Sequence, residues 1–241
     1  MGLMFIGGQD MRIPAYLVIL LILTFAAPLQ AASGGGGGGG MAPQQSMKRL
    51  TPEEKAAASY DSGTKHRDRA AKYERQAIEQ TNAKKLAKLQ KKIAREYARA
   101  IKDYERSIGH YARFSEAHNS VGYALRKVGR YEESLAAYNV AIRINPYFDQ
   151  AIEYRGEAYL GLNRLDEAKE AYIELFQNDR TLAEQLMAAM IVWVGDRRDD
   201  ANGLESAVVE QFAVWVEQRS ELASFVHPMN DAARFSWAEL R

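Results

Sequence analysis

Hydrophobic residues recur at every third or fourth position in a stretch that begins shortly after residue 82. The apolar positions of this stretch are Leu86, Leu89, Ile93, Tyr97, Ala100, Tyr104 and Ile108. This spacing places them on one face of an α-helix, and Asn82 suits the N-cap position. The pattern predicts one continuous helix from about Asn82 to Ile108, roughly 40 Å long. A shorter helix, from about Lys65 to Gln80, is expected to pack back on it.

The last part of the chain has the same helical spacing in two further segments. LAEQLMAAMIVWV and SAVVEQFAVWVEQRSELASF are amphipathic and are separated by GDRRDDANG. We expect this pair of helices to be a divergent third unit or a cap that covers the last hydrophobic face. Trp193, Phe212 and Trp215 are expected in its core rather than in a ligand cage. A tail from His227 follows, and the sequence leaves open whether it docks on the rest of the protein.

Between these regions the chain repeats itself with a period of 34 residues. NSVGYALRKVGRYEESLAAY and YRGEAYLGLNRLDEAKEAY place small residues where an ordinary amphipathic helix has Leu or Ile. The offset of 34 pairs Ala117 with Ala151, Gly122 with Gly156, Ala124 with Ala158, Arg130 with Arg164, Glu133 with Glu167, Ala137 with Ala171 and Tyr138 with Tyr172. Small residues let two antiparallel helices approach closely, and we expect Tyr138 and Tyr172 to fill the remaining holes.

The repeated segment, Ser115 to Leu182, resembles the tetratricopeptide repeat family. The residues at the signature places of the family are Gly122, Tyr138, Ala141 and Pro146 in the first copy and Gly156, Ala168 and Tyr172 in the second. The second copy departs from the family at Leu175 and Arg180, where a small residue and a proline are usual. The resemblance implies an all-α fold: a short superhelix of antiparallel helix pairs, here with a long N-terminal helix and a divergent C-terminal capping pair.

In this family the first helix of each pair lines a concave groove that holds a peptide or a partner segment. The inward positions carried over from the family are Asn119, Tyr123, Arg126, Glu153, Glu157 and Leu160. Because Glu153 and Glu157 would repel a ligand carboxylate, the resemblance favours a basic or neutral partner segment and disfavours a clamp for a C-terminal carboxylate. The chain's own tail or its long basic helix is the alternative occupant. His118 stands where the family often has Trp, and we interpret it as a packing residue.

The first part of the chain has the pattern of a targeting segment. Ile13 to Ala32 is uncharged, follows Met11-Arg12 and ends in small residues, as a secretory signal peptide does. Translation from Met11 rather than Met1 would give a signal peptide closer to the usual pattern, because Asp10 would then lie outside its positively charged end. An uncleaved membrane anchor is the alternative, because the apolar run is long enough to span a bilayer. We therefore expect an exported, periplasmic protein or one anchored in the inner membrane and facing the periplasm.

These patterns divide the chain into five segments. Seven glycines at 34–40 predict a flexible tether rather than a folded element. The expected segments are 1–32, a signal peptide or anchor; 33–49, a Gly-rich linker; 50–110, basic helices forming a degenerate first repeat unit; 111–182, two repeats; and 183–241, capping helices and the tail.

Charge is distributed unevenly although the net charge is only +1. Residues 48–113 contain 18 Lys or Arg against 9 Asp or Glu, a net of +9, and residues 114–241 contain 13 against 21, a net of −8. The stretch KKLAKLQKKIAREYARAIK concentrates the cations. Solvated helix faces are the ordinary explanation, and a basic surface for anionic lipid headgroups or an acidic partner is the alternative. The sequence shows no fold that would read bases, so we expect no nucleic-acid partner.

Catalytic and metal-binding patterns are missing from the sequence. The chain has no cysteine, no GxSxG, no HExxH and no glycine loop followed by Lys-Ser or Lys-Thr. Its histidines are scattered, at His66, His110, His118 and His227. We therefore expect no enzyme activity, no catalytic residue, no metal site and no cofactor. The sequence predicts a non-catalytic protein–protein interaction or assembly module of a bacterial envelope. The alternative is an envelope scaffold that acts through self-association or membrane contact of the long basic helix.

Overall fold

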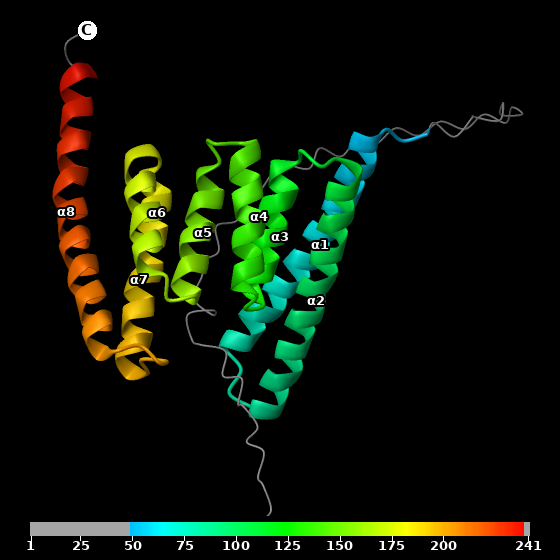
Figure 1. Ribbon diagram of the computed structural model, residues 1–241, viewed down its shortest axis with the longest axis horizontal. Coiled ribbons are helices and arrows are strands. Elements are labelled where there is room, and N and C mark those ends of the chain that lie inside the picture. Colours follow the sequence, from blue (N-terminus) through cyan, green and yellow to red (C-terminus); the bar gives the residue numbers. More distant parts are fainter. Residues whose placement is uncertain (1–48, 239–241) are drawn as a thin grey trace, which may run out of the picture.

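The computed structural model describes the backbone of residues 49–238 and the side chains of residues 49–223. This part of the chain is all-α, with eight helices and no strand. The helices follow one another as a row of antiparallel neighbours, and chain order is also spatial order (Figure 1). The predicted signal segment and the seven glycines lie outside the described residues.

The helices fall into four consecutive pairs, of which the middle two correspond to the repeated segment. Their bounds are α1 Pro52–Ile78, α2 Ala83–His110, α3 Ser115–Lys127, α4 Tyr131–Ile144, α5 Asp149–Gly161, α6 Leu165–Asn178, α7 Arg180–Asp199 and α8 Ser206–Ala238.

The N-terminal hairpin is longer than the sequence pattern indicated. Helix α1 begins at Pro52 and not near Lys65, because Thr51 and Glu54 form a capping box: the Thr51 hydroxyl accepts from the Glu54 amide, and the Glu54 carboxylate accepts from the Thr51 amide. Asn82 caps α2 as predicted, since its side-chain oxygen accepts from the amide of Lys85 at 3.0 Å.

The two repeats pack through small residues, as predicted, but their contacts differ. A Cβ atom on Gly122 would lie 2.5 Å from the ring of Tyr138, so the close approach of α3 and α4 requires glycine. A Cβ atom on Gly156 would instead meet Leu186 of α7 at 2.6 Å. The expectation that Tyr172 fills this hole was therefore wrong. The Tyr172 ring lies 5.7 Å from the ring of Trp215 in α8.

The C-terminal helices also depart from the predicted bounds. Asp179 alone separates α6 from α7 and caps α7 by accepting from the amide of Leu182 at 3.1 Å. Arg180, which stands at the place of the usual proline, is the first residue of α7. Helix α7 runs through most of the predicted linker, and α8 continues through the expected tail beyond His227.

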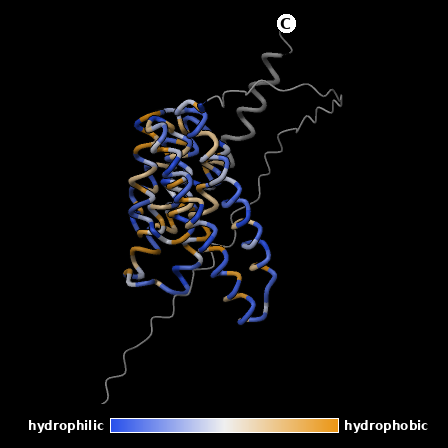
Figure 2. The backbone as a smooth tube through the Cα atoms, turned by 90° about the vertical axis from the view of Figure 1, so that its right-hand side faces the viewer, coloured by the Kyte–Doolittle hydropathy of each residue, from blue (hydrophilic) through white to orange (hydrophobic). Residues whose placement is uncertain are grey.

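An aromatic core joins α7 and α8, as predicted for a cap. Trp193 and Phe212 are each 1% exposed, and their rings meet edge to face with centroids 5.2 Å apart. The indole Nε1 of Trp193 donates to the carbonyl of Leu160 at 2.9 Å and ties this core to the second repeat. Hydrophobic positions gather among the packed helices (Figure 2). None of the helices in residues 49–238 combines the length and apolar character of a membrane span.

Candidate functional site

Helices α3 and α5 place the sequence-predicted partner-binding residues next to one another on the inner face of the repeats. Arg126 of α3 forms an ion pair with Glu157 of α5. The Arg126 guanidinium carbon also lies 5.5 Å from the centre of the Tyr123 ring and 5.1 Å from that of Tyr154. We call these residues, together with Asn119 and Glu153, the α3–α5 cluster.

The α3–α5 cluster is largely closed to solvent. Asn119, Arg126 and Glu157 are buried, and Glu153 is 0% exposed. Tyr123 is half-buried. Leu160, the sixth predicted position, belongs to the hydrophobic core shared with α7 and α8. The sequence pattern had indicated an acidic strip along the groove. In the structure the two glutamates lie inside the protein, and one of them is neutralised by Arg126.

Burial changes the proton affinity of Glu153. Desolvation raises the pKa of its carboxyl group from 4.5 to about 7, although Arg126 and a hydrogen bond donated by Gln150 oppose the shift. The same burial disfavours the charge on Arg126, but Tyr138, Glu153 and Tyr123 hold its pKa above the ordinary value. Glu153 is therefore partly protonated near neutral pH, whereas Arg126 stays charged.

Several polar atoms of the α3–α5 cluster are buried without a hydrogen-bond partner. They are Asn119 Oδ1, Arg126 Nε and Nη2, Glu153 Oε1 and Glu157 Oε1. A buried polar atom without a partner costs about 1 to 3 kcal/mol, so native structures keep few of them. Five such atoms therefore make the α3–α5 cluster a polar region inside the protein.

Residues beside the α3–α5 cluster make contacts that hold the helices together. Lys127 of α3 pairs with Glu74 of α1 at 3.0 Å and closes the side toward the N-terminal hairpin. His118 Nε2 donates to the carbonyl of Ala112 at 3.0 Å, which agrees with a packing role. No group of three or more His, Asp or Glu side chains in the described part of the chain is placed to hold a metal ion.

A second site, an open apolar groove, lies between α6, α7 and α8. Its volume is about 410 Å³. We call it the α6–α8 groove; it is lined by Tyr172, Phe176, Arg180, Ala183, Glu184, Met187, Ala188, Ile191, Ser220 and Ala223. Ile191, one of these lining residues, is 51% exposed.

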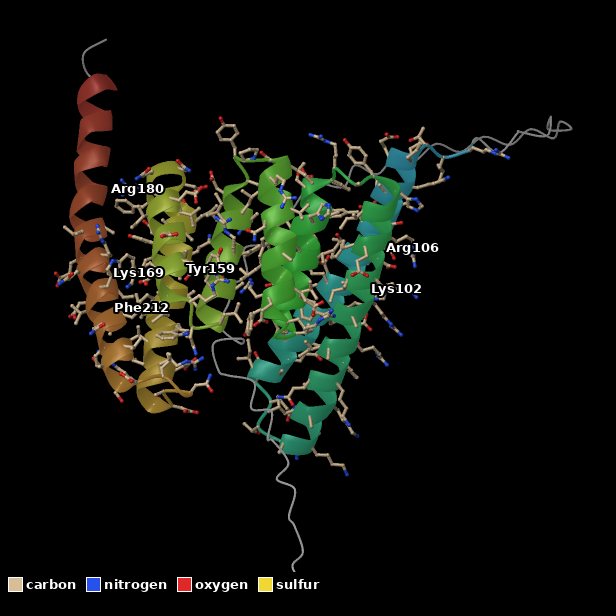
Figure 3. The ribbon with its side chains drawn as sticks, viewed as in Figure 1. Lys102, Arg106, Tyr159, Lys169, Arg180 and Phe212 are labelled. Atoms are coloured by element: carbon tan, nitrogen blue, oxygen red, sulfur yellow. The ribbon has the colours of Figure 1, made fainter. Side chains whose placement is uncertain are left out.

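Two cationic side chains, Lys169 and Arg180, lie between α6 and the neighbouring helices (Figure 3). The guanidinium carbon of Arg180 lies 3.4 Å from the centre of the Phe176 ring. Lys169 Nζ lies 5.7 Å from the Phe212 ring and 5.9 Å from the Trp215 ring, between α6 and α8. The α6–α8 groove thus has an apolar interior with Arg180 and Glu184 at its margin.

The α6–α8 groove was not predicted, although the repeat period contains a signal for it. Extending the offset of 34 once more pairs Glu153 with Met187 and Glu157 with Ile191. The inward positions that are polar in the first two units are therefore apolar in α7. The width of the groove depends on the direction of α8, which the pattern does not specify.

Comparison with known proteins agrees with this architecture. The family model for the tetratricopeptide repeat matches residues 115–148 and 155–181. No curated protein matches the chain.

Three solved structures that match are also tetratricopeptide-repeat domains. The TPR2B domain of yeast Sti1 in an Hsp70 complex is 14% identical, with 68% of this chain and 98% of that chain covered and a TM-score of 0.38. The second such domain of human RPAP3 with an HSP70 peptide is 20% identical, with 56% and 97% covered and a TM-score of 0.40. The first such domain of Spaghetti (RPAP3) with an HSP90 peptide is 19% identical, with 54% and 91% covered and a TM-score of 0.38. The two segments that match the tetratricopeptide-repeat model coincide with the helix pairs α3–α4 and α5–α6, and the flanking helices lie outside the match.

Proposed function

We propose that this protein is a protein-interaction module that holds an apolar segment of a partner protein in the α6–α8 groove. The observation that carries the proposal is the open groove itself, with Ile191, Met187 and Phe176 along its walls. Apolar side chains exposed in a groove are stabilised when a partner covers them, at about 25 cal/mol for each Å² removed from water.

The dimensions and chemistry of the α6–α8 groove suit a short amphipathic segment. The lining residues of α7 extend from Arg180 to Ile191, about 16 Å of helix, which is the length of three turns in a bound helix. Met187 adapts its shape to different apolar side chains. Arg180 and Glu184 place charges of both signs at the margin, where polar groups of a partner orient the bound segment.

The α3–α5 cluster is a second candidate surface, and its polar atoms without partners favour it. A basic or neutral partner segment would supply donors for Glu153 and Glu157. Such a segment would first have to displace the side chains that bury these carboxylates. Partner binding by Asn119, Tyr123, Arg126, Glu153, Glu157 and Leu160 stays a prediction.

Photo-cross-linking tests the location of the partner. A photoreactive phenylalanine analogue replaces Ala188 in the α6–α8 groove or Glu170 on the exposed face of α6. We expect the same cross-linked protein to be captured in cells repeatedly from position 188 and not from position 170. Equal capture from both positions would contradict a groove-bound partner, and capture from Tyr123 instead would move the partner to the α3–α5 cluster.

A matched pair of substitutions sharpens the test. Ile191→Asp introduces a charge into the α6–α8 groove at a position that is 51% exposed. Val214→Asp introduces the same charge at a position that is 50% exposed and does not line the groove. We expect Ile191→Asp to abolish capture of the partner and Val214→Asp to preserve it.

We also propose that the module is non-catalytic and acts outside the cytoplasm. The repeat architecture supports the first statement, and the signal-like pattern of Ile13 to Ala32 supports the second. N-terminal sequencing of the mature protein from fractionated cells distinguishes cleavage after this segment from an uncleaved anchor. Recovery of unprocessed chain in the soluble cytoplasm would contradict export.

A further inference from the structure

Helix α2 carries a straight row of cations on the face opposite its packed side. We call this row the basic stripe; it consists of Lys84, Lys88, Lys91, Arg95, Arg99, Lys102 and Arg106. At 3.6 residues per turn these positions fall within an arc of about 80°, and the row is about 33 Å long. All seven residues are exposed. Lys102 and Arg106 mark the end of the stripe nearer the C-terminus of α2 (Figure 3).

The opposite face of α2 fixes the direction of the basic stripe. Tyr97, Ala100 and Tyr104 are each 0% exposed and pack toward α1 and α3. Because these residues lie about half a turn away from the stripe, the packing of the hairpin holds the cations toward the solvent. The stripe is therefore a fixed surface of the fold and does not depend on a mobile loop.

Neighbouring carboxylates leave most of the positive charge of the stripe uncompensated. Glu96 and Asp103 lie beside the packed face, where Glu96 pairs with Arg99 at 3.0 Å and Asp103 with Arg106 at 2.9 Å. Glu96 is also approached by Arg69, so one carboxylate is shared among several cations. Within residues 49–223, no carboxylate lies within 4.0 Å of the ammonium groups of the four lysines of the stripe.

We propose that the basic stripe docks this face of α2 on an anionic lipid bilayer. A straight, convex ridge of point charges matches a flat anionic surface, which needs no shape complementarity. The stripe contains no apolar residue that would enter the hydrocarbon region, so contact stays at the headgroups and weakens with salt. An acidic protein would offer the same charge, but a convex ridge provides no groove to hold it.

The start of the helical domain strengthens the choice of a bilayer. Ser107 Oγ donates to the carbonyl of Ala56 at 2.8 Å, so the beginning of α1 lies beside the last cation of the stripe. Nineteen residues, 33–51, connect this point to the apolar run Ile13 to Ala32. They reach about 65 Å when fully extended, twice the length of the stripe. When the apolar run lies in a membrane, α2 is therefore held within reach of the same surface, and two weak attachments reinforce each other.

Vesicle binding by the full chain tests the proposal. The stripe variant carries Lys88→Gln, Lys91→Gln and Lys102→Gln, and the matched control carries Lys55→Gln, Lys65→Gln and Lys72→Gln at exposed positions of α1. Binding is measured to phosphatidylcholine vesicles and to vesicles that also contain phosphatidylglycerol. Binding to the neutral vesicles measures the apolar run alone. We expect the additional binding to anionic vesicles to fall about a hundredfold in the stripe variant, about fivefold for each lysine, and to change far less in the control.

A local probe distinguishes contact through α2 from a general effect of charge. Because the chain has no cysteine, Ala98→Cys beside the stripe and Glu170→Cys on α6 each give one labelling position. We expect a spin label at position 98, and not at 170, to lose contact with a water-soluble relaxation reagent on anionic vesicles. Equal anionic binding by the stripe variant and the wild type would overturn the proposal. Binding of polyglutamate without binding of anionic vesicles would overturn it in favour of an acidic protein, and loss of a dimer in the stripe variant without vesicle binding would overturn it in favour of self-association.

Discussion

The inner face of the repeats is closed and polar at α3 and α5 but open and apolar at α6, α7 and α8. Glu153 is 0% exposed inside the first region, whereas Ile191, one repeat later at the equivalent position to Glu157, is 51% exposed in the second. The same helical periodicity thus produces an internal ion-pair cluster in one unit and a surface groove in the next.

The units also differ at the position that holds glycine in the repeats. Gly122 and Gly156 let neighbouring side chains approach to distances that a Cβ atom would forbid. Met190 stands at the third equivalent position and is 0% exposed, so the third unit has a large side chain where the first two have glycine. The rings of Trp193 and Phe212 pack edge to face and join α7 to α8. The third unit therefore lacks the glycine contact that the first two units share.

The largest expected effect is at the aromatic core that holds the α6–α8 groove. Trp193→Ala removes a fully buried ring and leaves the carbonyl of Leu160 without its donor. We expect a loss of about 3 to 5 kcal/mol in the free energy of unfolding, measured by urea denaturation. Trp215→Ala, at a half-buried ring of the same core, is the control and should cost clearly less. Equal costs would show that Trp193 is not the residue on which the groove depends.

The next largest effect is expected at Gly122, in the closely packed pair α3 and α4. Gly122→Leu places a side chain against the Tyr138 ring, which a Cβ atom alone would approach to 2.5 Å. We expect it to destabilise the protein by about 1 to 3 kcal/mol or more. Gly195→Ala in α7 meets no atom within 4 Å and should stabilise by about 0.5 to 1 kcal/mol, because alanine favours the helix. Equal unfolding midpoints for the two variants would mean that the repeat register is wrong.

A third prediction concerns the pH dependence of stability in the α3–α5 cluster. Because burial raises the pKa of Glu153 from 4.5 to about 7, the native state binds more protons than the unfolded state between these values. The contribution of Glu153 to the free energy of unfolding therefore decreases as the pH rises from about 4.5 to about 7, and it is constant above pH 7. Glu153→Gln should remove this slope and raise stability at pH 8 by about 1 to 2 kcal/mol. Urea denaturation across this pH range measures it, with Glu170→Gln as the control that keeps the slope.

The smallest effect is expected at the open groove. Ile191→Asp changes a residue that is half exposed, so the free energy of unfolding should change by less than about 0.5 kcal/mol. Chemical denaturation of this variant beside Val214→Asp checks the expectation. A loss of several kcal/mol would mean that Ile191 is part of the core, and the α6–α8 groove would then be closed in solution.

Local patterns in the sequence were sufficient for the repeats and for the long helix. Gly122, Tyr138 and Asn82 act on neighbours within a few turns of the same helix pair, so their spacing predicts their contacts. The start of α1 was also encoded locally, by Thr51 and Glu54, but the sequence analysis overlooked it.

Features that depend on distant helices were not predictable in the same way. Glu153 is 0% exposed and its charge interacts with that of Arg126 on another helix. The side chain that Gly156 faces is Leu186 of α7 rather than Tyr172 of its own repeat. The α6–α8 groove depends on the direction of α8, which no periodic pattern specifies. Sequence therefore predicts which residues face inward, and only the packing of successive units decides whether they meet a partner or one another.

Thiol labelling of single cysteines in the cysteine-free chain tests the contrast most directly. Ala188→Cys reports the α6–α8 groove, Asn119→Cys reports the α3–α5 cluster, and Glu170→Cys gives the rate of an exposed helix position. We expect position 188 to react nearly as fast as position 170, and position 119 to react slowly until denaturant unfolds the protein. Rapid labelling at 119 together with protection at 188 would contradict it, because the polar cluster would then be the open surface and the groove would be closed.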